Sequence, residues 1–354
     1  MRRQVVAAVL AGVVGLTTTA AGRPDRSAVE IPAADRAVSF TVDGTVAYGT
    51  VHVPAHRPGR RLPAALLLPG SGPTDRNGDQ PPTLTPHTLA LIAGVLGDQG
   101  VLTLRFDKYF AGETGGGAYS TDPGRIDLAA FIRQADAGYR LMARQTETDP
   151  AKLMVVGHSE GGLTGMLVAN SVRPRPVGLA LLEPQDLRLL DLVDLQLGEQ
   201  LDAAVAAGQL SQQVSAGNKA GISAVIAEFR AGRPTDTSAL LPGIAALFDQ
   251  SLFTAANSNY VRTEDALYPP SVAAEVARGT TVLVTGGTED SNVPSATLGP
   301  LVSALHRAGT RGPGLVVLPG LDHYLHPAGT PANDQVLAPS AVAALRSFAN
   351  RVTR

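Results

Sequence analysis

The chain has 354 residues, of which 44% are hydrophobic and 17% charged, which is enough apolar material for a large buried core. Its net charge of −2 comes without a clustered basic stretch, which argues against a nucleic-acid partner because neutralising phosphates requires such a surface. The absence of cysteine excludes disulfides, thiolate zinc sites and lipid-modified cysteines. The length fits one large α/β domain with an insertion, or two small domains.

The first 21 residues have the pattern of a secretory signal peptide. Arg2 and Arg3 precede an uncharged apolar run from Val5 to Leu16, and small residues follow as far as Ala21. A helix of that apolar length would reach only about 18 Å, short of the roughly 30 Å hydrocarbon core of a bilayer. We expect cleavage after this segment, a secreted or extracytoplasmic location, and no membrane span in the mature protein. An uncleaved membrane anchor is the alternative, and the general and twin-arginine export routes both stay open.

Strands and helices are expected to alternate along most of the remaining chain. In chain order, the spacing of apolar residues predicts a strand hairpin over 38–53 that turns at Asp43-Gly44, a strand over 63–68, a helix over 85–97, a strand over 101–106, a helix over 126–146, a strand over 153–156, a helix over 161–172 and a strand over 178–182. After an interruption, the pattern resumes with a strand over 281–284, a helix over 296–307, a strand over 315–318 and a helix from Ser340. This alternation predicts an α/β fold with a mostly parallel, doubly wound sheet.

The interruption runs from about Glu183 to Tyr268. Apolar residues at helical spacing predict three amphipathic helices there, around 190–201, 222–229 and 241–248. The predicted organisation is therefore a signal peptide over 1–21, a core in two parts over 22–183 and 271–354, and an inserted helical cap over 184–270. The cap is expected to cover the site and supply much of its pocket, although most of its apolar residues should simply pack between the cap and the core.

The sequence Gly157-His158-Ser159-Glu160-Gly161 lies between a predicted strand and a predicted helix. A strand that turns sharply into a helix strains its middle residue, exposes that side chain above the sheet, and requires small residues two places to either side. This context predicts Ser159 as a nucleophile, with Gly157 and Gly161 as the elbow glycines. A tight turn with an incidental serine is the alternative. His158 is interpreted as packing beneath the turn.

Extended by Gly162, this elbow resembles that of the α/β-hydrolase superfamily, specifically its secreted bacterial esterase and serine-aminopeptidase-like branch. The segment from Leu68 to Gly78 resembles the oxyanion-hole loop of that branch, and Arg105 to Lys108 resembles the strand end and loop that follow. The likeness covers roughly residues 38–352, is weakest across the inserted helices, and departs from the branch at Tyr109 to Ala111, at the rim of the pocket. It implies the α/β-hydrolase fold and acyl transfer at a serine.

Acyl transfer builds negative charge on a carbonyl oxygen, which two preorganised donors must stabilise. One expected donor is the N–H of Glu160, directly after the nucleophile. The other is expected at the N–H of Ser71 in the Gly-rich loop that follows an early strand, with Gly72 as the alternative. An ordinary connecting loop is the competing interpretation of this segment. Asp75 and Arg76 are expected to pair and hold the loop.

The superfamily places its acid after a late strand and its base after the last strand. The segment from Gly287 to Pro294 resembles the family's Gly-x-x-Asp-x-x-Val-Pro pattern, which puts the acid at Asp290. Glu289 beside it and Glu183 after an earlier strand are the rivals. The acid would orient the imidazole of the base without itself taking the proton.

The base is expected at His323, which follows the last predicted strand, and His326 is its rival. The imidazole would take the proton of Ser159 and return it to the leaving group. The sequence has no His-Glu-x-x-His stretch for zinc and no Gly-x-x-x-x-Gly-Lys loop for phosphate. We therefore expect neither a metal nor a cofactor.

These residues predict a serine carboxylesterase that cleaves small-molecule esters with small to medium apolar acyl groups through an acyl-enzyme. The oligomeric state stays open. A peptidase that removes N-terminal residues is one alternative, and it would need an acidic group in the cap to hold the substrate ammonium. Candidates for that group are Glu199, Asp202, Glu228 and Asp249. A non-catalytic extracellular binding protein on the same fold is the other alternative.

Overall fold

The computed structural model describes residues 30–354 of the chain. The predicted signal peptide, residues 1–21, lies outside this range. Within the described range, no helix is long and apolar enough to cross a membrane.

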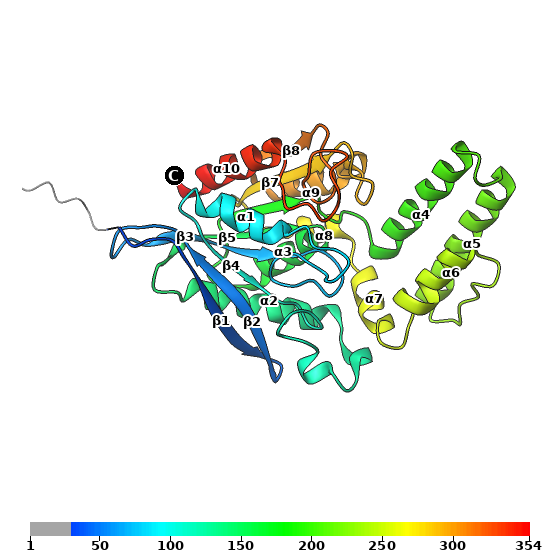
Figure 1. The fold of residues 1–354 in the computed structure, drawn as a ribbon, viewed down its shortest axis with the longest axis horizontal. Coiled ribbons are helices and arrows are strands. Elements are labelled where there is room, and N and C mark those ends of the chain that lie inside the picture. Colours follow the sequence, from blue (N-terminus) through cyan, green and yellow to red (C-terminus); the bar gives the residue numbers. More distant parts are fainter. Residues whose placement is uncertain (1–29) are drawn as a thin grey trace, which may run out of the picture.

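One eight-stranded sheet forms the centre of the protein, in the order β1-β2-β4-β3-β5-β6-β7-β8 (Figure 1). The strands are β1 (Ala34–Val42), β2 (Thr45–Val53), β3 (Leu62–Leu68), β4 (Leu102–Phe106), β5 (Thr148–His158), β6 (Gly178–Leu182), β7 (Thr281–Gly287) and β8 (Arg311–Leu318). β2 runs antiparallel to both β1 and β4, and all neighbours from β4 to β8 are parallel. The predicted α/β class with a mostly parallel sheet is confirmed.

Helices cover both faces of this sheet (Figure 1). The core helices are α1 (Thr88–Gly97), α2 (Leu128–Ala143), α3 (Glu160–Ser171), α9 (Gly299–Ala308) and α10 (Pro339–Thr353). On β3, Ala65 and Leu67 pack with α1 and α10 on one face, whereas Leu66 and Leu68 pack with α2, α3 and α9 on the other. All of β3 is therefore buried, which explains its continuous apolar sequence.

The insertion between β6 and β7 consists of helices. They are α4 (Leu189–Ala206), α5 (Gln212–Arg230), α6 (Pro242–Leu247), a π-helical turn over Phe248–Leu252, α7 (Ser258–Asp265) and α8 (Pro269–Ala273). In Figure 1, α4, α5 and α6 project from one side of the core, and α7 lies at the junction. The sequence predicted three helices in this region and missed α7 and α8. Both are short, and α7 is mostly polar, so neither has a clear apolar period.

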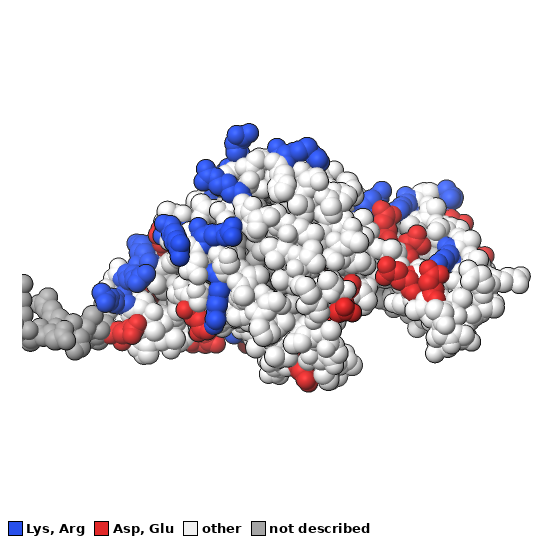
Figure 2. Space-filling view, turned by 90° about the horizontal axis from the view of Figure 1, so that it is seen from above, with Lys and Arg blue, Asp and Glu red and all other residues white. Residues whose placement is uncertain are grey.

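The inserted helices have an apolar cluster of their own, which includes Leu197, Ile222 and Phe248. Several Asp and Glu side chains gather on this projecting part, while Lys and Arg are spread over the core on the face drawn in Figure 2. One ion pair joins two of the inserted helices, since Asp202 of α4 lies 2.6 Å from Lys219 of α5. The insertion therefore has its own packing in addition to its contacts with the core.

The carboxylate of Asp265, at the end of α7, joins the inserted helices where they meet the core. It lies 2.8 Å from Arg230 of α5 and 3.2 Å from Arg188, which precedes α4. It also accepts the backbone N–H of Leu190 at 2.9 Å. Asp265 is buried, so these partners offset the cost of removing a charge from water.

Candidate active site

Ser159 lies at the turn between β5 and α3, with φ 57° and ψ −124°. This backbone conformation is sparsely populated for a non-glycine residue and persists only where the surroundings impose it. A Cβ at Gly157 would lie 1.9 Å from the carbonyl oxygen of Gly161, and one at Gly161 would lie 2.3 Å from that of Leu68. Only glycine fits either position, which accounts for the glycines two residues before and two residues after Ser159.

His323 joins Ser159 to Asp290. Its Nε2 lies 3.0 Å from Oγ of Ser159, and its Nδ1 lies 2.8 Å from Oδ2 of Asp290. A proton on Nδ1 is donated to the carboxylate, which leaves Nε2 free to accept the serine proton. All three side chains are largely buried, so the interactions act where little water screens them. The arrangement can activate the serine hydroxyl as a nucleophile.

Asp290 is held as a carboxylate. Its Oδ1 accepts the backbone N–H groups of Asn292 and Val293, both at 2.8 Å. Burial alone would raise the pKa of Asp290, but the hydrogen bond and charge of His323, together with these two N–H groups, lower it below the ordinary value. A negative charge is thus available to stabilise the imidazolium that forms during proton transfer.

Glu183, the distant rival for the acid, lies beside Asp290 but contacts different groups. Its Oε2 accepts the backbone N–H of Gly287 at 2.6 Å, and its side chain is fully buried. Burial, with the charge of Asp290 as a further cause, raises the pKa of Glu183 to about 8. The neighbouring carboxyls therefore carry one negative charge at neutral pH, on Asp290. Glu289, the local rival, hydrogen-bonds only to Thr288 through its side chain within the described residues.

The two other histidines considered at this site have separate positions. Nε2 of His158 lies 2.7 Å from the backbone carbonyl oxygen of His323, and the two rings are 4.9 Å apart. Burial, together with the charge of His323, lowers the pKa of His158 to about 3, so the neutral ring donates this hydrogen bond. Packing beneath the turn was thus only part of its role. His326 is buried, and its Nδ1 lies 3.6 Å from Oδ2 of Asp322. Of the two histidines that were rivals for the base, only His323 contacts Ser159 among the described residues.

Ser71 and Glu160 lie beside Ser159, one on the loop after β3 and one at the start of α3. Within residues 30–354, the backbone N–H of neither residue donates a hydrogen bond. The N–H of Glu160 is free because it belongs to the first turn of a helix. Two hydrogen bonds to carbonyl oxygens hold the loop after β3 in place. The carbonyl oxygen of Ser71 accepts a hydrogen bond from Nε2 of Gln80 at 2.6 Å, and that of Gly70 accepts one from Nζ of Lys108 at 3.1 Å. Both N–H groups are available to stabilise an oxyanion.

The expected pair of Asp75 and Arg76 does not form. The Asp75 carboxylate instead accepts the backbone N–H of Asn77 at 2.7 Å, within the loop itself. Arg76 turns toward the buried Asp107, after β4, and donates to both of its carboxylate oxygens at 2.9 and 2.6 Å. A planar guanidinium matches a carboxylate in this two-point geometry. The prediction was wrong because the partner of Arg76 comes from a different strand end.

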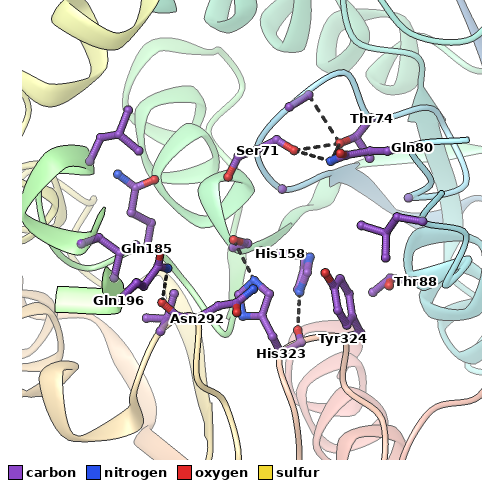
Figure 3. Close-up of a pocket in the computed structure, with 18 of the residues that line it drawn as sticks. Ser71, Thr74, Gln80, Thr88, His158, Gln185, Gln196, Asn292, His323 and Tyr324 are labelled. Carbon is purple, nitrogen blue, oxygen red and sulfur yellow. Dashed lines mark hydrogen bonds between the residues drawn. The ribbon is translucent and has the colours of Figure 1, made fainter. Parts of the chain in front are cut away.

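A cavity of about 420 Å³ opens in front of Ser159 (Figure 3). Figure 3 shows Ser71 and Gln80 on one side of it, Gln196 and Asn292 on another, and His323 and Tyr324 below. Nε2 of Gln196 in α4 donates to the carbonyl oxygen of Asn292 at 2.6 Å, so the insertion contacts the loop that carries the candidate acid. Inserted residues supply part of the wall, namely Leu189, Leu192, Val193, Gln196 and Leu252.

No family model matches the sequence. No curated protein matches it either. Among solved structures, the chain is similar to Est1E from Butyrivibrio proteoclasticus, determined with ferulic acid bound, with a TM-score of 0.55, 15% identity, and coverage of 89% of this chain and 99% of that chain. It is similar to DcsB, determined in complex with its substrate analogue, with a TM-score of 0.54, 18% identity, and coverage of 90% and 99%.

A puromycin-hydrolyzing peptidase from Mycobacterium tuberculosis is also similar, with a TM-score of 0.53 and 15% identity. The likeness covers 90% of this chain and 39% of that chain. With the order and directions of the strands, these similarities establish that the chain has the α/β-hydrolase fold that the elbow predicted.

Proposed function

We propose that this protein is a serine hydrolase that cleaves carboxylic esters. The observation that carries the proposal is the position of His323, which contacts the hydroxyl of Ser159 through one ring nitrogen and the carboxylate of Asp290 through the other. The strained elbow and the N–H groups of Ser71 and Glu160, which donate to no group within the described part of the chain, supply the remaining parts of an acyl-transfer site. A binding protein without activity would not need these parts together.

In the proposed first step, Oγ of Ser159 attacks the ester carbonyl while its proton moves to Nε2 of His323. The carbonyl oxygen becomes an oxyanion beside the N–H groups of Ser71 and Glu160, and Asp290 stabilises the imidazolium. The intermediate then collapses, the bond to the alcohol breaks, and His323 protonates the departing oxygen. A water molecule repeats the sequence on the acyl-enzyme, which releases the acid and restores Ser159.

The proposed substrates are esters with small to medium apolar acyl groups. The cavity of about 420 Å³ is of a size that takes small molecules. Leu189, Leu192 and Val193 of the insertion give it an apolar side close to Ser159. Gln185 and Gln196 give it polar groups that can fix the orientation of an ester.

A peptidase that removes N-terminal residues is the second candidate. The observation that favours it is a buried acidic residue in the inserted segment, Glu264 of α7, which lines a cavity next to the oxyanion loop. The four acids considered from the sequence have other surroundings. Asp202 pairs with Lys219, Asp249 accepts the hydroxyl of Thr237, Glu228 accepts the N–H of Asp236, and Glu199 is exposed.

A substrate panel tests the proposal. Purified wild type and Ser159→Ala are compared on p-nitrophenyl acyl esters of increasing chain length and on aminoacyl nitroanilides. We expect turnover of short and medium acyl esters, and a loss of about 10³-fold or more in kcat in the alanine variant. Turnover of the anilides alone would favour the peptidase. Equal turnover by Ser159→Ala would remove this serine from the reaction.

We also propose export of the protein from the cytoplasm, on the pattern of residues 1–21 alone. Cell fractionation and N-terminal sequencing of the exported protein test this. A new N-terminus after residue 21 is expected, and retention of the intact chain in the cytoplasm would contradict the proposal.

A further inference from the structure

A second cavity, of about 440 Å³, lies on the other side of the oxyanion loop. It shares part of its wall with the first cavity, namely Ser71, Gly72, Leu189 and Leu252. Glu264 and Tyr260 reach it from α7, and Glu160 reaches it from the start of α3. A substrate whose carbonyl group lies at Ser159 therefore has this cavity within its immediate surroundings.

Several buried polar atoms of this wall lack a hydrogen-bond partner within residues 30–354. They are both carboxylate oxygens of Glu264, the hydroxyl oxygen of Tyr260 and Oε2 of Glu160. Glu264 is only 1% exposed, although carboxyl groups are rarely buried without a partner. Unpartnered groups that gather on one cavity indicate a missing ligand, because a bound donor could satisfy them together.

The charged side chains around this cavity indicate that the ligand carries a positive charge. Nζ of Lys108 lies 2.9 Å from Oε1 of Glu160, so among residues 30–354 this ion pair leaves Glu264 as the acid of this wall without a paired cation. Burial, and then the charge of Glu160, raise the pKa of Glu264 to about 8. The polar side chains of Tyr260 and Gln185 and the positive charge of Lys108 limit this rise. A bound cation would favour the carboxylate form of Glu264 and supply its missing partner.

Aromatic rings form much of the remaining wall. The ring centres of Tyr260 and Phe131 lie 5.1 Å apart in an edge-to-face arrangement. Those of Phe131 and Tyr109 lie 5.6 Å apart in the same arrangement. Lys108 already lies over Phe131, with Nζ 5.1 Å from the ring centre. Aromatic faces attract alkylammonium groups and also accept their methylene chains, so this wall suits an amine at the end of a carbon chain.

We propose that this second cavity binds the ammonium group of a substrate, with Glu264 as its counterion and Tyr260 as a hydrogen-bond partner. The proposal rests on the proposed function, since it assigns the cavity to the same substrate that reacts at Ser159. It narrows the proposed ester substrates to those whose apolar chain ends in a primary amine. A cavity that holds only water or an apolar chain would not need Glu264.

Binding in the absence of turnover tests the subsite separately from the chemistry. Calorimetry on Ser159→Ala compares hexylammonium with 1-hexanol, which has the same chain length and no charge. We expect hexylammonium to bind at least ten-fold more tightly, and we expect its affinity to rise from pH 6 to pH 9 as Glu264 ionises. Equal affinity for the two probes would overturn the proposal.

Variants then locate the binding. Adding Glu264→Gln to Ser159→Ala should abolish the preference for hexylammonium, whereas Glu199→Gln, on the exposed surface of the same insertion, should preserve it. Thermal unfolding checks that each variant is folded. If Glu264→Gln does not fold, Tyr260→Phe replaces it and should reduce the preference about three-fold. A preference that survives in a folded Glu264→Gln protein, or is unchanged in Tyr260→Phe, would contradict the assignment.

Turnover separates failure of the subsite from failure of the proposed chemistry. Wild type is given matched p-nitrophenyl esters whose acyl chains end in either an ammonium or a methyl group. At one chain length or more, we expect at least ten-fold higher kcat/KM for the ammonium ester, and loss of this difference in Glu264→Gln. Turnover without any such difference would overturn the subsite but not the esterase. Hexylammonium binding without turnover of any ester would overturn the esterase but not the subsite.

Discussion

The neutral ring of His158 donates a hydrogen bond to the backbone carbonyl oxygen of His323 across 2.7 Å. The residue before the candidate nucleophile thus holds the loop that carries the candidate base. Because the donor is buried and its pKa is lowered to about 3, the interaction persists over the whole pH range in which an imidazole base works. The distance between Ser159 and His323 is therefore fixed from two sides, by Asp290 and by His158.

Replacing His158 with phenylalanine should lower kcat without a large change in KM. The variant keeps a buried ring and removes the donor, so the backbone carbonyl of His323 loses its hydrogen bond to the nucleophile turn. A loss of about ten-fold in kcat is expected, since small displacements of a catalytic group are costly. Steady-state kinetics on a p-nitrophenyl ester measures it, with thermal unfolding as the check on folding. An unchanged kcat in a folded variant would show that this hydrogen bond has no positioning role.

Asp290→Asn and Glu183→Gln should differ strongly in activity. Asn removes the charge that orients and stabilises the imidazole of His323, and a loss of about 10⁴-fold in kcat is expected. Glu183 is protonated at neutral pH, so its replacement by the neutral amide should cost less than about ten-fold. The kcat values of the two variants are measured in the same ester assay. A larger loss of kcat in Glu183→Gln than in Asp290→Asn would make Glu183 the acid.

Glu264→Gln should change how stability depends on pH. The pKa of Glu264 is raised to about 8 in the folded protein, so the folded state holds a proton that the unfolded state releases above the ordinary glutamate pKa. Stability from this group is present at low pH and is lost as pH rises toward 8. The variant lacks this loss, so its Tm relative to wild type should rise by about 2–4 °C between pH 5 and pH 9.

Glu199→Gln is the matched control for this series, because Glu199 is exposed on α4. Its Tm should follow that of wild type at every pH. A constant difference between Glu264→Gln and wild type across the range would mean that Glu264 does not titrate as described.

The strain at Ser159 predicts a difference between two inactive variants. Ser159→Gly and Ser159→Ala both remove the hydroxyl and its contact with His323. Glycine adopts φ 57° without penalty and alanine does not, so the glycine variant should have the higher free energy of unfolding, by about 1 kcal/mol. Urea denaturation of the two variants measures the difference. Equal stabilities would mean that the elbow is not strained.

The candidate triad could be predicted from the sequence because each member follows a strand of a parallel sheet. Ser159 follows β5, Asp290 follows β7 and His323 follows β8, and the carboxyl ends of parallel strands meet at one edge. Local motifs and chain order are then enough to bring the three residues together. The same reasoning placed Ser71, which follows β3 at that edge.

Glu264 and the partner of Arg76 could not be predicted in this way. Glu264 lies in a short polar helix with no apolar period, and its burial arises from packing of the insertion against the core. Arg76 has an acidic neighbour in sequence, but the structure gives it a buried carboxylate at the end of another strand, Asp107. Both cases depend on tertiary contacts that local spacing does not record.

The successive residues Glu264 and Asp265 connect the insertion to the chemistry in a particular way. Asp265 binds Arg188 and Arg230, which fasten α4 and α5, whereas Glu264 faces the second cavity. A tilt of the inserted helices would consequently shift the proposed amine counterion, whereas Ser159, Asp290 and His323 all come from the core. If the proposed subsite holds, substrate preference can therefore change through mutations in the insertion, while the residues proposed to break the bond stay unchanged in the core.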